Sequence, residues 1–96
     1  ARIHALATVL VVAAGAVFPL TRIEWSLVVL AIAGVWTAEA FNTALEALVD
    51  LVSPQRQPLA AKAKDIAAGA VLLAACGAVV IGMLVFVPHL YRILHD

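Results

Sequence analysis

Three apolar runs, each close to the length of a membrane-crossing helix, limit most strongly what this chain can fold into. They cover approximately residues 5–20, 25–52 and 62–88, and a helix needs about 20 residues to cross the hydrocarbon core of a bilayer. Only 12% of the 96 residues are charged and 66% are hydrophobic, which leaves too little polar surface for a water-soluble domain. The sequence therefore predicts an all-α membrane protein, with three transmembrane helices in a single domain over residues 1–96.

The ends of these runs are set by proline and by charge. The first run closes at Pro19; a signal peptide could also have such an apolar core, but no small-x-small cleavage site leads into a polar mature domain, so we expect a short spanning helix. Pro88 is expected to end the third helix. His89 and His95 would then be solvated beyond it.

The positive charges indicate an orientation. The amino terminus and the second loop carry four basic residues and the opposite side carries two, which favours a cytoplasmic location for the first side. The formal net charge is zero and no basic tract is present, which excludes nucleic acid as a partner. The cytoplasmic set is Arg2, Arg56, Lys62 and Lys64, and the outer set is Arg22 and Arg92.

One face of the second helix is acidic. At 100° per residue, four polar side chains lie within an arc of about 80°; we call Glu39, Asn42, Glu46 and Asp50 the acidic stripe. A carboxylate inside a membrane costs about 3 kcal/mol unless it faces protein, water or a cation. The stripe therefore requires a compensating partner.

Basic residues lie across the next turn. Lys62, Lys64 and Asp65 open the third helix, and an antiparallel hairpin would bring them to the Glu46–Asp50 end of the stripe. Carboxylate and amide oxygens bind Mg²⁺ together with phosphates, and a lysine balances phosphate charge, so this mixture suits a metal-bound polyphosphate. The sequence has neither a P-loop nor a Rossmann glycine motif. Glu39, placed deeper, could act on a molecule that arrives from the lipid.

A second pattern, on the third helix, predicts a packing partner. Small residues recur every fourth position, at Ala70, Ala74, Ala78 and Gly82, and such stripes allow membrane helices to approach closely. The spacing does not say whether the partner helix belongs to the same chain or to another.

The stripe, followed by Lys64-Asp65 and a small-residue run at 67–70, resembles the signature of the bacterial integral-membrane diacylglycerol kinase and undecaprenol kinase family. The resemblance implies a homotrimeric helical bundle in the bacterial cytoplasmic (inner) membrane. Each three-span subunit would help transfer the γ-phosphoryl group of Mg-ATP to a lipid hydroxyl at the cytoplasmic interface, in sites shared between neighbouring subunits.

The resemblance also implies roles for individual residues. Glu39 corresponds to the general base and Glu46 to a Mg²⁺ ligand, while the nucleotide contacts correspond to Asn42, Gln55, Arg56, Gln57, Lys64 and Asp65. The chain departs from the family in three respects. An amino-terminal surface helix looks truncated or absent, His4 stands where some members have a second metal-binding glutamate, and Gln57 replaces a common histidine. His4 is accordingly a second candidate metal ligand.

Three functions are compatible with an intramembrane carboxylate. The first is a lipid kinase, with undecaprenol favoured and diacylglycerol next as acceptor. The second is a small ion- or proton-coupled transporter centred on Glu39, and the third is a structural oligomer held by polar contacts. A transporter should place its charges near the midplane, whereas these charges run toward a basic turn at one interface. The gradient favours the kinase.

Overall fold

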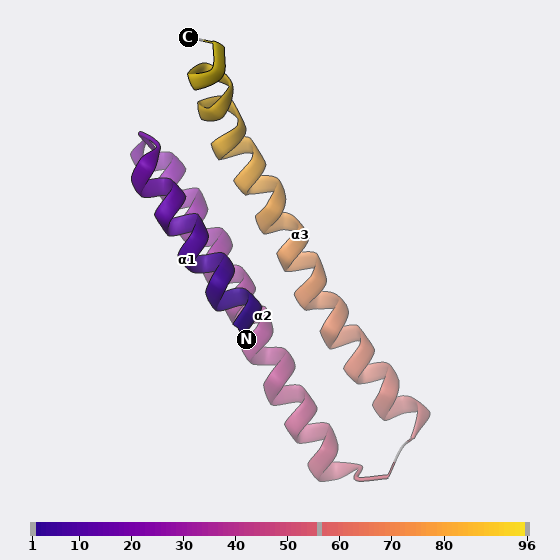
Figure 1. Cartoon of the computed structure of the whole chain (residues 1–96). Helices are drawn as coiled ribbons and strands as arrows, with labels where there is room; N and C mark the ends of the chain where they lie inside the picture. The colour runs from indigo at the N-terminus through magenta and orange to yellow at the C-terminus, as the bar shows by residue number, and fades with distance from the viewer. Residues whose placement is uncertain (1, 56, 96) are drawn as a thin grey trace.

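The computed structural model describes residues 2–55 and 57–95, and within them the chain forms three helices: α1 (Arg2–Val17), α2 (Arg22–Val52) and α3 (Pro58–His95). They make a rod of 60 × 20 × 17 Å. α2 and α3 run antiparallel and make most of the interhelical contacts, while α1 returns along the first half of α2 (Figure 1). The prediction of an all-helical fold is confirmed.

Two of the helices are long and apolar enough to cross a membrane, namely α2 with 31 residues and α3 with 38. α1 is apolar but has only 16 residues, which corresponds to about 24 Å. Large apolar side chains remain exposed along all three helices. An exposed apolar surface of this extent is suited to lipid as its surroundings.

The turn between α1 and α2 is held by a helix cap and by close packing. The Thr21 hydroxyl accepts the Glu24 N–H, and the Glu24 carboxylate accepts the Thr21 N–H, which together form a capping box. Nearby, the ring of Trp25 lies against the backbone of Gly15, where any Cβ would come within 2.5 Å of Cη2. The absence of a side chain at Gly15 therefore permits the close approach of α1 and α2.

The interface between α2 and α3 is built from small and β-branched residues. Val28 and Val35 of α2 and Val85 of α3 are buried. Three members of the predicted small-residue stripe, Ala74, Ala78 and Gly82, are partly buried, while Ala70 is exposed. Ala78 and Gly82 also line a cavity together with residues of α1 and α2, so this part of the stripe faces helices of the same chain.

The end of the third helix differs from the expectation. α3 continues through Pro88 to His95, although a proline removes one backbone hydrogen bond. His89 is buried rather than solvated, and its Nε2 lies 3.0 Å from both carboxylate oxygens of Glu24. Phe86 also packs edge-on against Phe18. These contacts, made before and after the proline, hold the helix against the α1–α2 turn.

The loop between α2 and α3 lies at the opposite end of the rod from the α1–α2 turn (Figure 1). The N–H of Ser53 donates to the Val49 carbonyl and closes α2. Pro58 opens α3, a position where its missing N–H costs nothing. The end of α2 and the start of α3 are thereby placed side by side.

Candidate functional site

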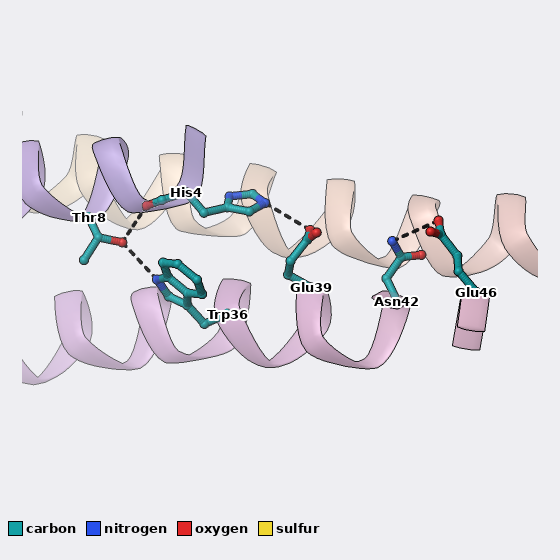
Figure 2. A network of polar contacts seen from close by, with 6 residues as sticks. All are labelled: His4, Thr8, Trp36, Glu39, Asn42 and Glu46. Carbon is teal, nitrogen blue, oxygen red and sulfur yellow. Dashed lines mark hydrogen bonds and ion pairs between the residues drawn. The ribbon is translucent and has the colours of Figure 1, made fainter. Parts of the chain in front are cut away.

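The deepest carboxylate of the acidic stripe has a partner from α1. His4 Nε2 lies 3.2 Å from Oε2 of Glu39, and the two side chains are 20% and 26% exposed (Figure 2). An unpartnered carboxylate at this depth would be costly. His4 of the same chain is thus a partner for Glu39 that the sequence analysis did not identify.

Two further residues fix the histidine. The Thr8 hydroxyl donates to the backbone carbonyl of His4 at 2.7 Å and accepts the Trp36 Nε1–H at 3.0 Å (Figure 2). The rings of His4 and Trp36 meet edge-on, with centroids 6.2 Å apart. Because Trp36 and Glu39 are one helical turn apart on α2, the same stretch of α2 orients both the histidine and its carboxylate partner.

The middle of the stripe presents oxygen atoms. Asn42 Nδ2 donates to Oε1 of Glu46 at 3.4 Å (Figure 2), while Asn42 Oδ1 is buried and has no hydrogen-bond partner among the described residues. A carboxylate and an unpartnered amide oxygen are ligands that Mg²⁺ prefers. Within residues 2–55 and 57–95, no three His, Cys, Asp or Glu side chains gather into a complete metal site. Glu46 and Asn42 are thus two oxygen ligands that a metal ion could use, and any further ligands would have to come from elsewhere.

The third part of the site is a polar hollow beside the α2–α3 loop. Lys64 Nζ pairs with Oδ1 of Asp50 at its wall. Four predicted nucleotide contacts line this loop hollow, namely Gln55, Gln57, Lys64 and Asp65. Arg56 lies outside the described residues.

An apolar cavity lies between the three helices, and His4, Thr8 and Trp36 form its polar part. Most of its remaining lining is Ala, Val and Ile from α1, α2 and α3. A hydrocarbon chain would suit such walls. The His4–Glu39 pair thus stands next to an apolar space, and the loop hollow lies farther along α2.

The structure therefore brings the candidate residues together in three groups rather than one. His4 meets Glu39, Asn42 meets Glu46, and the loop residues line the same hollow as Lys64. Sequence reasoning identified neither Thr8 nor Trp36 as a member of the site. Their spacing could have indicated this. Thr8 is four residues after His4 and Trp36 is three residues before Glu39, and residues three or four apart lie on the same face of a helix.

Comparison with known proteins gives relatives over most of the chain. The profile of the prokaryotic diacylglycerol kinase family matches residues 1–86. An undecaprenol kinase of Bacillus subtilis is 44% identical over 87 residues, which are 91% of this chain and 71% of the relative. A diacylglycerol kinase of Synechocystis is 42% identical over 94 residues, which are 97% of this chain but only 54% of the relative.

These similarities agree with the resemblance carried by the acidic stripe and do not favour a transporter. Two apolar helices of spanning length are also consistent with an integral membrane protein, and membership of a kinase family implies a donor of the ATP type. The chain belongs to the prokaryotic diacylglycerol kinase family and is, as a member, a lipid kinase.

Proposed function

We propose that the chain transfers the γ-phosphoryl group of ATP to the hydroxyl of a membrane lipid at the cytoplasmic face of the bacterial inner membrane, with undecaprenol favoured over diacylglycerol. The observation that carries this proposal is the order of groups along α2. Glu39 contacts His4, which lines the apolar cavity; Glu46 follows with its free oxygen donors, and the loop hollow lies at the end. A lipid acceptor and a polyphosphate donor could approach from opposite ends of such a series.

In the proposed reaction Glu39 is the general base. It accepts the proton of the lipid hydroxyl while the lipid oxygen forms a bond to the γ-phosphorus and the bond to the β–γ bridging oxygen breaks, which releases ADP. A lipid chain in the apolar cavity would place its hydroxyl near the polar end formed by His4. The name of the Bacillus relative supports undecaprenol as acceptor.

Mg²⁺ is the cofactor that the oxygen donors fit. Glu46 and Asn42 would hold it, and when bound it neutralises charge on the transferring phosphoryl group. Lys64 and Asp65, with the loop glutamines, would contact the nucleotide. Asp50 holds the Lys64 ammonium at the wall of the loop hollow, where that charge can balance phosphate oxygens.

A neighbouring subunit would complete this site. Glu46 is exposed and Asn42 Oδ1 lacks a partner within the described part of the chain, so a single chain leaves the metal ligands open on one side. We propose a homotrimer whose sites are shared between adjacent subunits, in a multi-pass arrangement with the loop hollow in the cytoplasm.

Transfer of labelled phosphate in vesicles tests the proposal. The purified protein is incubated with Mg²⁺ and γ-labelled ATP in vesicles that contain undecaprenol, diacylglycerol or neither. We expect labelled lipid, with more product from undecaprenol, and a loss of about a hundredfold or more in turnover for Glu39→Gln. A folded Glu39→Gln protein that works at the parental rate would overturn the catalytic role of this carboxylate.

A further inference from the structure

The contact between His4 and Glu39 can orient the Glu39 carboxylate as well as compensate its charge. Only Oε2 of Glu39 is engaged, by His4 Nε2; no hydrogen bond from the described residues reaches Oε1. One oxygen is therefore tied to α1 and the other is available. A base that takes a proton from a substrate needs such an asymmetry, since its reactive oxygen must be held at a defined place.

We propose that His4 is a positioning residue for the general base: its Nε2–H donates to Oε2 of Glu39 and thereby directs Oε1 toward the lipid hydroxyl. This inference rests on the proposed function. It gives His4 a task in proton transfer, whereas its place in the sequence had made it a candidate metal ligand. The acidic side chain that offers free oxygen atoms for a metal is instead Glu46, whose partner is Asn42.

Three contacts make His4 suitable for this task. Its backbone is held by the Thr8 hydroxyl, its ring borders the Trp36 indole, and Trp36 is itself tied to Thr8. The network joins α1 to the turn of α2 that carries Glu39. Among the described residues, the side-chain hydrogen bonds between α1 and α2 are those of His4 with Glu39 and of Trp36 with Thr8, so they constrain where the amino-terminal part of α1 lies.

The test compares three replacements of His4 in the lipid kinase assay. A glutamine places an amide nitrogen near the position of Nε2, whereas an asparagine reaches only as far as Nδ1 and a leucine donates nothing. We expect His4→Leu and His4→Asn to lower kcat by about tenfold to a hundredfold, with the KM for Mg-ATP and the Mg²⁺ requirement unchanged. His4→Gln should recover most of the lost rate. His95→Leu, a change at the far end of α3, is the matched control and should keep the parental rate.

The same replacements in a Glu39→Gln background separate the possible roles. If His4 acts through Glu39, His4→Leu should cause little further loss once the carboxylate is gone. A full additional loss, or a His4→Gln variant as slow as His4→Leu, would overturn the inference. A raised Mg²⁺ requirement in His4→Leu would assign the histidine to the metal instead.

A measurement without turnover keeps this inference distinct from the proposed function. If the parental protein phosphorylates no lipid, the proposed function fails, yet the ring-nitrogen NMR signal of Nε2 still reports the contact. That signal should move in Glu39→Gln and stay in place in Glu46→Gln. An Nε2 signal that is the same in the parent and in Glu39→Gln would refute the hydrogen bond and, with it, the positioning role.

Discussion

Two glutamates of α2 differ in how far the rest of the chain surrounds them. Glu39 is partly buried and contacts His4, whereas Glu46 is exposed and accepts only the Asn42 amide among the described residues. The first carboxylate is thus fixed in orientation, and the second keeps oxygen lone pairs open. This difference matches a division between proton transfer at Glu39 and metal binding at Glu46.

The metal-binding role predicts a specific defect for Glu46→Gln. The amide keeps the shape of the side chain but removes a negative ligand, so the Mg²⁺ concentration needed for half-maximal lipid phosphorylation should rise by about tenfold or more. Titration of Mg²⁺ at saturating ATP measures this directly, with circular dichroism to verify the fold. An unchanged Mg²⁺ titration would remove Glu46 from the metal site.

At the scale of helices, close packing can depend on a residue that has no side chain. Gly15 accommodates the Trp25 ring, whereas a Cβ added at Gly69, Gly77 or Gly82 of α3 would meet nothing within 4 Å. In lipid the hydrophobic effect does little to drive helices together, so close van der Waals contact must supply much of the stability. A single added methyl group at a helix contact can therefore change the stability of the protein.

The same substitution at two glycines should give opposite results. In Gly15→Ala the new Cβ would lie 2.5 Å from the Trp25 ring, while at Gly34 nothing lies within 4 Å of it. We expect Gly15→Ala to cost about 1–3 kcal/mol and Gly34→Ala to be neutral or stabilising, since alanine favours helix. Thermal unfolding in a mild detergent compares them. Equal stability of the two variants would contradict the packing seen between α1 and α2.

The sequence predicts the helices and the acidic stripe well, because both depend on local spacing. Apolar length predicts the three helices, and the 100° repeat places Glu39, Asn42 and Glu46 on one face. Sequence-based prediction fails where the contact partner of a residue lies far away along the chain. Nothing near His89 indicates Glu24, which is 65 residues away in sequence, and so the continuation of α3 through Pro88 was not predicted.

At the scale of the whole molecule, the two long helices exceed the thickness of a bilayer. α2 and α3 have 31 and 38 residues, or about 46 and 57 Å, against a hydrocarbon core of about 30 Å. Part of the rod must therefore stand outside the apolar layer. The loop hollow, the most polar region, is the part best suited to lie in water.

A homotrimer is the expected assembly, because one chain leaves Glu46 and the Asn42 oxygen open. Cross-linking and mass measurement in a mild detergent should show three copies. A monodisperse monomer that phosphorylates lipid would contradict the assembly.

The orientation is expected to place the loop hollow in the cytoplasm and the end of α3 outside. Labelling of sealed vesicles tests this in a Cys76→Ala background, which removes an exposed thiol. A cysteine at Gln55 should react only with a reagent on the cytoplasmic side, and a cysteine at His95 only with one outside. The reverse pattern would show that the distribution of basic residues was misleading.

Because α2 is a continuous helix from Arg22 to Val52, it limits where residues can be inserted into or deleted from such a chain. The helix fixes the separation of Glu39 and Glu46 at seven residues, about 10 Å. One inserted residue between them would rotate every later side chain by about 100° and turn Glu46 and Asp50 away from the face that carries Glu39. The length of the segment from Glu39 to Asp50 therefore cannot change without loss of the shared face, and insertions or deletions should be accommodated in the loops at either end.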